Sequence, residues 1–86
     1  MARVRVHPRV LTKRPQLETM DIVYAFENTL RTRARDTDPV RWVGVGVDPH
    51  GQLLEYVAVE DEPGGWLIYH AMPATTKVLR EVGLRR

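Results

Sequence analysis

The hydrophobic pattern of this chain changes its period near residue 30, and this change restricts the folds that the chain can adopt. Before residue 30, Leu17, Met20, Val23 and Phe26 recur at the spacing of one helix face, which predicts an amphipathic helix over about 18–29. After residue 30, apolar residues alternate with other residues, which is the period of a strand. The pattern therefore predicts a helix followed by a run of strands, as in an α+β domain.

Four strands are expected after the helix, over about 31–35, 42–47, 52–60 and 65–71. Between the second and third strands, the sequence Asp48-Pro49-His50-Gly51 is typical of a hairpin turn. Proline presets the first dihedral angle of the turn, and Gly51 can adopt the left-handed conformation that closes it. Short connections of this kind join antiparallel neighbours, so the four strands are expected to form an antiparallel meander.

The two ends of the chain predict short additional elements. Val4 and Val6 alternate with arginines in a short extended start, and a turn or short helix is expected between Pro8 and Pro15. Pro73 suits the first position of a last helix, which Gly83 would cap. The expected fold is thus α+β in one domain spanning 1–86: N-terminal helical segments, a four-stranded antiparallel meander sheet and a short C-terminal helix. The helix over 18–29 should cover one sheet face and leave the other partly open.

Composition excludes several classes of function. The chain of 86 residues has no cysteine, so a disulfide framework, a thiolate zinc site and a cysteine nucleophile are excluded, and a reducing cytoplasm is the expected location. There is no serine for a Ser-His-Asp triad. No run of about 18 apolar residues and no signal-peptide pattern is present, so we expect no membrane association.

The charged residues are sorted into blocks, although the formal net charge is only +2. Residues 1–17 carry bases without acids, 18–30 carry acids without bases, 31–41 are mainly basic, 42–66 carry acids without bases, and 67–86 are mainly basic. Either the basic residues are simply solvated, or the three basic blocks converge into a cationic face able to hold phosphates. If they converge, Arg33, Arg35 and Arg80 are expected nucleic-acid contacts.

Three histidines are candidates for acid–base chemistry because their side chains titrate near neutral pH. His50 lies in the predicted turn and is most simply a solvated loop residue. His70 ends the fourth predicted strand in phase with Trp66 and Ile68, and it is either a hydrogen-bonded structural histidine or a general base or acid near Lys77. His7 precedes a basic segment, and both interpretations apply to it equally.

Metal and cofactor sites are not expected. The histidines lack the spacing of a zinc site, and no glycine-rich phosphate loop is present, since Gly44 and Gly46 lie inside a predicted strand. These two glycines indicate either the close approach of another chain or ligand, or space for a neighbouring aromatic ring. Histidine, lysine and arginine can together cleave RNA without a metal, by accepting and donating protons and by neutralising the phosphate. The composition permits this chemistry and does not select it.

The whole pattern resembles a known family. The residues that carry the resemblance are His7, Lys13-Arg14, the run from Leu17 to Ala25, Val43 to Gly46, Gly51 to Glu55, and Ile68-Tyr69-His70-Ala71-Met72-Pro73. From about residue 4 to 82, this order resembles small BrnT-like toxins of the RelE/ParE-like group, from type II toxin–antitoxin pairs. The resemblance implies a compact α+β fold, endoribonuclease activity that inhibits translation, and a cognate antitoxin bound to the active face. By matching position, it implies that His7, Arg14, His70 and Lys77 form the catalytic site.

Two other functions remain open at this stage. The chain could be a non-catalytic binding module of the same fold, which holds a protein or nucleic acid on its open sheet face. It could also be a homodimer without enzymatic activity, paired through a strand edge or through the surface of Trp42 and Trp66.

Overall fold

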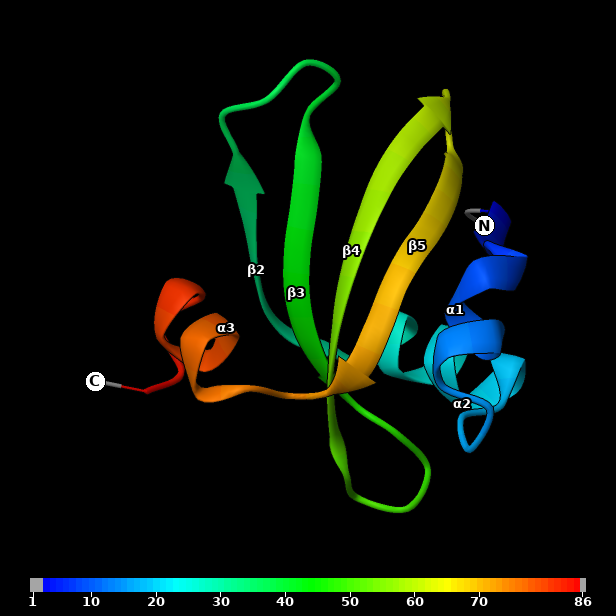
Figure 1. The fold of residues 1–86 in the computed structure, drawn as a ribbon. Coiled ribbons are helices and arrows are strands. Elements are labelled where there is room, and N and C mark those ends of the chain that lie inside the picture. Colours follow the sequence, from blue (N-terminus) through cyan, green and yellow to red (C-terminus); the bar gives the residue numbers. More distant parts are fainter. Residues whose placement is uncertain (1–2, 86) are drawn as a thin grey trace.

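A computed structural model describes residues 3–85. As the sequence predicts, a run of four strands follows two helices near the N-terminus. Figure 1 shows their arrangement. In chain order, the elements are β1 (Arg3–Val6), α1 (Pro8–Lys13), α2 (Thr19–Glu27), β2 (Thr29–Arg35), β3 (Arg41–Val47), β4 (Leu53–Glu62), β5 (Gly65–Pro73) and α3 (Thr76–Glu81). None of the helices in this part of the chain is long and apolar enough to cross a membrane.

The sheet has five strands in the order β1-β5-β4-β3-β2, and the prediction of four antiparallel strands is wrong in this respect. The strands β2 to β5 form the expected antiparallel meander, but β1 pairs parallel to β5, from Arg3 against Gly65 to Val6 against Ile68. Two parallel strands cannot be joined by a tight hairpin. Here α1 and α2 carry the chain from β1 at one edge of the sheet to β2 at the other, and the meander then returns to β5 beside β1. The general α+β class is confirmed, with a mixed sheet.

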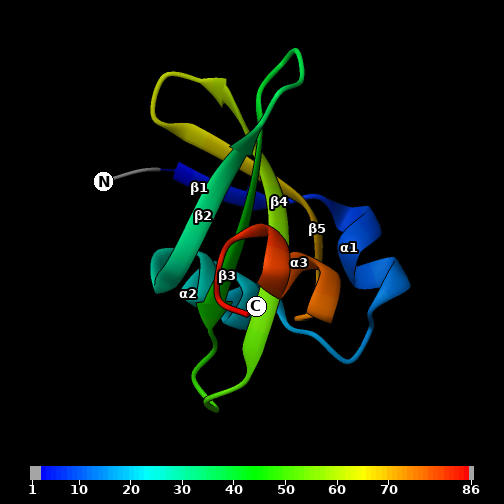
Figure 2. The same ribbon diagram turned by 90° about the vertical axis from the view of Figure 1, so that its left-hand side faces the viewer.

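The helices cover the sheet on both faces. Figure 1 places α1 and α2 on one side of the sheet and α3 on the other, and the view in Figure 2 looks onto the α3 side. A core of Val10, Ile22, Leu54 and Ile68 with their neighbours fills the α1/α2 face. A smaller core fills the α3 face, with Val43, Val45, Val57, Val78 and Val82 as its buried members. The predicted helix over 18–29 therefore covers one face, as expected, and a short helix covers part of the other.

The last helix begins later than predicted. Pro73 ends β5 and does not open the helix, because the ladder with β4 continues to the pair Leu54–Pro73. Thr75 is the N-cap of α3, and its hydroxyl accepts a bond from the backbone N–H of Val78. The predicted cap at the other end is present: Gly83 has φ +85°. The N–H groups of Gly83 and Leu84 bond to the carbonyls of Arg80 and Leu79, the arrangement that ends many helices.

The structure shows what stabilises the predicted turn and why β3 contains glycine at positions 44 and 46. Asp48 is buried, and its carboxylate accepts bonds from the backbone N–H groups of His50 and Gln52, while Gly51 has φ +80°. A Cβ at Gly44 would collide with the Tyr56 ring, and one at Gly46 with the Ala25 carbonyl of α2. Gly44 thus makes space for an aromatic ring, and Gly46 lets a helix of the same chain approach the sheet.

Candidate functional site

A β-bulge decides where the His70 side chain points. The β4–β5 ladder pairs Val57 with His70 but Ala58 with Ile68, so Tyr69 is an extra residue on β5. Residues directly opposite in an antiparallel pair share a face, and Val57 belongs to the core on the α3 face. His70 therefore projects from the α3 face, and the expectation that it lies in phase with Trp66 and Ile68 is wrong.

On that face, His70 is bound to a buried carboxylate. Its Nε2 lies 2.8 Å from Oε2 of Glu55, a residue only 4% exposed on the adjacent strand β4. The other oxygen of Glu55 accepts bonds from the backbone N–H of Thr75 at 2.8 Å and from its hydroxyl at 2.6 Å. Thr75 thus caps α3 and also fixes the carboxylate that holds the imidazole.

These bonds keep Glu55 ionised at neutral pH. Burial by itself would raise the pKa of Glu55, but the hydrogen bonds from Thr75 and His70 outweigh burial and hold the pKa below its ordinary value. An ionised carboxylate only accepts hydrogen bonds, so Nε2 of His70 must be the donor. In the neutral imidazole, Nδ1 then carries the lone pair, and within residues 3–85 no protein group bonds to it. The His70 side chain is 38% exposed, so the imidazole is open to solvent.

Basic residues from all three blocks of the sequence surround His70. A cavity of about 310 Å³ on the α3 face is lined by His70 and Glu55 together with Arg9, Arg35, Arg41 and Lys77. His70 also lines a smaller hollow of about 100 Å³, together with Arg9, Lys13 and Arg14. The sheet thus gathers cations from both ends and the middle of the chain around one imidazole, although Arg3 and Arg5 pair instead with Glu62 and Asp61.

Tyr69, the extra residue of the bulge, lines both hollows. The guanidinium of Arg41 lies 5.9 Å from the centre of its ring, which places that cation over an aromatic face. Among the described residues, the Tyr69 hydroxyl is the buried side-chain polar atom without a hydrogen-bond partner. A buried hydroxyl without a partner marks a place where water or a ligand completes the structure.

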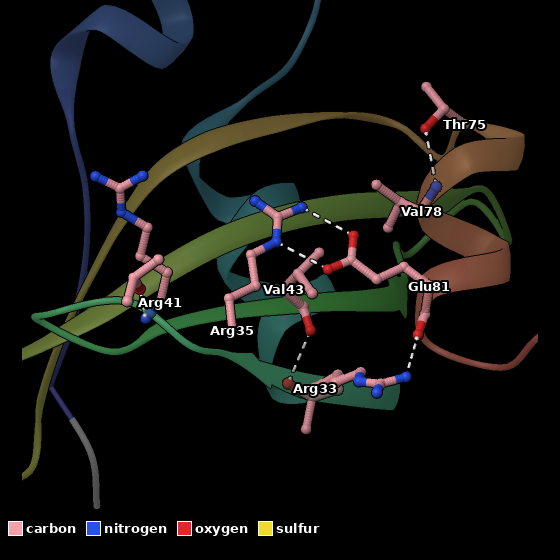
Figure 3. A network of polar contacts seen from close by, with 9 residues as sticks. Arg33, Arg35, Arg41, Val43, Thr75, Val78 and Glu81 are labelled. Carbon is pink, nitrogen blue, oxygen red and sulfur yellow. Dashed lines mark hydrogen bonds and ion pairs between the residues drawn. The ribbon is translucent and has the colours of Figure 1, made fainter.

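Arg35 connects the cavity to α3 (Figure 3). Its guanidinium donates two bonds to the Glu81 carboxylate, at 2.8 and 2.9 Å, and Arg33 donates a longer bond of 3.4 Å to the Glu81 carbonyl. The bond to Glu81 raises the pKa of Arg35, and the bond to Arg35 lowers the pKa of Glu81. Because Glu81 neutralises Arg35, the cations of the cavity with no carboxylate partner in residues 3–85 are Arg9, Arg41 and Lys77.

The structure separates the predicted site residues into two groups. His70, Arg14, Lys77 and Arg35 line the two hollows. The others lie elsewhere: His7 is the N-cap of α1, where its Nδ1 accepts a bond from the backbone N–H of Arg9, and Arg33 and Arg80 are exposed and line neither hollow. His50 is in the turn, with a side chain 76% exposed.

Sequence reasoning missed Glu55, Thr75, Arg9, Arg41 and Tyr69 as members of this site. One signal was available for Glu55, because a single acid stands inside the apolar run from Leu53 to Val59, where burial without a partner would be costly. The others become visible only when the bulge and the position of α3 are known.

Comparisons of the chain with protein-family models, with curated protein sequences and with solved structures give no match. The site itself defines the class: a small α+β domain with a carboxylate-oriented histidine in a cationic cavity. Within residues 3–85, no group of three His, Cys, Asp or Glu side chains is placed to hold a metal ion together.

Proposed function

We propose that this protein is an endoribonuclease in which His70 is the general base, and that it is the toxin of a type II toxin–antitoxin pair. The observation that carries the proposal is the Nε2–carboxylate bond of His70 to Glu55, inside a cavity lined by unneutralised cations. A carboxylate that fixes the tautomer of a histidine leaves its other nitrogen ready to take a proton. The substrate best matched to that nitrogen and these cations is a phosphodiester with a hydroxyl beside it.

The proposed reaction is transesterification within the RNA chain. Nδ1 of His70 takes the proton of a 2′-hydroxyl as the 2′-oxygen attacks the adjacent phosphorus, and the bond from phosphorus to the 5′-oxygen breaks. The products are a 2′,3′-cyclic phosphate and a 5′-hydroxyl. The leaving 5′-oxygen needs one proton, and we assign it to the ammonium of Lys77, which lines the same cavity as His70. DNA lacks the attacking hydroxyl and is not a substrate.

The cations supply the electrostatic part of this mechanism. The pentacoordinate phosphorus carries more negative charge than the starting diester, so positive groups that are fixed in advance favour the transition state. Arg9 and Arg41 line the cavity beside His70 and have no carboxylate partner in the described part of the chain. The guanidinium of Arg41 also lies over the Tyr69 ring. Arg14 lines the smaller hollow together with His70, and its guanidinium is 3.5 Å from the sulfur of Met72.

The toxin assignment depends on the sequence resemblance to BrnT-like toxins, including the run from Ile68 to Pro73 that contains the bulge. It implies an RNA substrate in the cytoplasm and a cognate antitoxin that covers the cationic cavity. Induced expression without the antitoxin should stop growth, and His70→Ala should restore it. Normal growth on induction of the folded wild-type protein would contradict the toxin assignment.

The cleavage step is tested on a labelled RNA oligonucleotide in buffer with EDTA. Wild-type protein should yield fragments ending in a 2′,3′-cyclic phosphate, and His70→Ala should reduce the rate by about 10²-fold or more, the usual contribution of a general base. His50→Ala is the matched control, because His50 lies in an exposed turn and lines neither hollow. This variant should keep the wild-type rate.

Two outcomes would overturn the proposal. Cleavage that is equal in wild-type and His70→Ala protein would remove His70 from the reaction. RNA binding by the wild-type protein without any cleavage, which weakens with salt and survives His70→Ala, would instead identify a non-catalytic binding module.

A further inference from the structure

The edge strand β2 has one side without a neighbour. It lies at the end of the strand order, spans seven residues from Thr29 to Arg35, and pairs only with β3 within residues 3–85. Five of its residues, from Leu30 to Ala34, are exposed. A long exposed edge presents unpaired backbone groups and is a template for another strand.

The side chains of β2 divide by charge between the two faces of the sheet. Arg33 pairs with Val43 and Arg31 with Val45, two residues of the core on the α3 face, so these arginines lie on that face. Neither Arg31 nor Arg33 has a carboxylate partner in the part of the chain that the structure describes. Thr32 pairs with Gly44 and Ala34 with Trp42, which places both on the opposite face.

An apolar hollow opens on that opposite face beside β2. It has a volume of about 310 Å³ and is lined by Phe26, Thr29, Thr32, Trp42, Tyr56 and Trp66. The two threonine hydroxyls are already bonded, Thr29 to the Phe26 carbonyl and the Tyr56 hydroxyl, and Thr32 to the Val43 carbonyl. The hydroxyls that line the hollow are therefore engaged, and its wall is mainly aromatic, which suits an apolar side chain.

We propose that β2 receives, as a sixth strand, an extended segment of a partner protein in which acidic and apolar residues alternate. Successive side chains of a strand point to opposite faces, so its acids would lie opposite Arg31 and Arg33 and its apolar residues beside Thr32 and the aromatic hollow. A second copy of this chain does not fit. Antiparallel pairing of β2 with itself would place arginines opposite arginines on the α3 face, and like charges in directly opposite positions are destabilising.

The probe is a synthetic, end-capped peptide of seven residues with glutamate at every odd position and leucine or valine at every even position. The chain has two tryptophans, Trp42 and Trp66, and both line the hollow, so their fluorescence reports directly on its occupancy. We expect saturable binding, a change in tryptophan emission, and slower hydrogen exchange of the β2 amides. The same peptide with lysine in place of glutamate should bind about tenfold more weakly or not at all.

A charge exchange provides the matched variants. The double variant R31E/R33E should lose affinity for the acidic peptide by on the order of tenfold and gain affinity for the lysine peptide. R80E/R85E makes the same change in charge at exposed positions near the C-terminus and should bind both peptides as the wild type does. Circular dichroism of each variant shows whether it is folded.

Three results would overturn the proposal: equal binding of the two peptides, unchanged affinity in R31E/R33E, or binding without protection of the β2 amides. Sedimentation of the protein alone should show a monomer. A dimer in which the β2 amides are protected from exchange would show that a second copy of this chain, and not a partner protein, occupies this edge. This inference does not require RNA cleavage, so its failure and the failure of the ribonuclease proposal are separate results.

Discussion

Glu55 is the residue on which the candidate site most depends, because it joins His70 of β5 to Thr75 at the start of α3. Its carboxylate fixes the tautomer of the imidazole, and it touches no substrate in the proposed reaction, so Glu55 is a positioning residue. It is also a source of stability. A group whose pKa is lower in the folded than in the unfolded protein stabilises the fold above the unfolded pKa.

For Glu55→Gln, we expect the free energy of unfolding at pH 7 to fall by about 1–3 kcal/mol, because a buried charged hydrogen bond is replaced by a weaker one. The wild-type advantage should be full at neutral pH and should vanish as the pH falls through the lowered pKa of Glu55. Urea unfolding of both proteins between pH 7 and pH 3 measures this difference. A difference that is constant over the whole range would contradict the assignment of an ionised Glu55.

The same substitution separates positioning from folding in the proposed reaction. An amide can donate to or accept from His70, so it no longer fixes Nε2 as the donor. The kcat of folded Glu55→Gln should fall by at least about tenfold with little change in KM, since the imidazole loses its fixed tautomer while the cations that bind RNA are unchanged. An unchanged kcat would leave Glu55 with a structural role only.

At the scale of the elements, sequence periodicity predicted what is local and missed what joins distant parts. The helix α2, the four strands of the meander, the Asp48–Gly51 turn and the Gly83 cap all follow from residues close together in the chain. The pairing of β1 with β5 does not, because it joins segments about sixty residues apart and depends on the path of two helices between them. The bulge at Tyr69 is equally hidden, since no residue in that run requires it.

The contact between α2 and β3 gives a test of helix placement. A Cβ at Gly46 would collide with the backbone carbonyl of Ala25, which cannot rotate away as a side chain would. Gly46→Ala should therefore destabilise the protein by about 1–3 kcal/mol, the usual cost of overpacking. Thermal and urea unfolding measure this cost, and a variant within 0.5 kcal/mol, on the order of a neutral surface change, would contradict the close approach.

The ion pair between Arg35 and Glu81 holds the short helix α3 against the edge of the sheet. Both side chains are partly exposed, at 35% and 25%, so a double-mutant cycle with R35Q and E81Q should give a coupling of only about 0.5–1 kcal/mol that shrinks in high salt. Hydrogen exchange of the α3 amides should become faster in E81Q. Arg80→Gln, an exposed change on the same helix, should leave that exchange rate unchanged.

For the whole molecule, the sorted charges of the sequence were informative only as a set. The blocks left two interpretations open, solvated bases or a cationic face, and the fold gathers residues of all three blocks around His70. Which arginine of each block takes part was not predictable, because that depends on local partners. Arg3 and Arg5 are paired with acids at the end of β4, and His7 caps a helix. Arg9 and Arg41, which no sequence pattern singled out, line the cavity instead.

This convergence predicts how RNA binding depends on salt. Each phosphate that is neutralised on a single strand contributes about −0.7 to the slope of log affinity against log salt concentration. Arg9, Arg41 and Lys77, the unpaired cations of the larger cavity, should together contribute about −2 to the slope for His70→Ala, which binds RNA without cleaving it. Successive replacement of these three residues by glutamine should bring the slope closer to zero by about 0.7 at each step. Fluorescence anisotropy of a labelled RNA measures the slope. Arg80→Gln is the matched control and should leave the slope as it is. If instead the slope changes equally at all four positions, the phosphates contact the whole basic surface and the cavity around His70 has no special role.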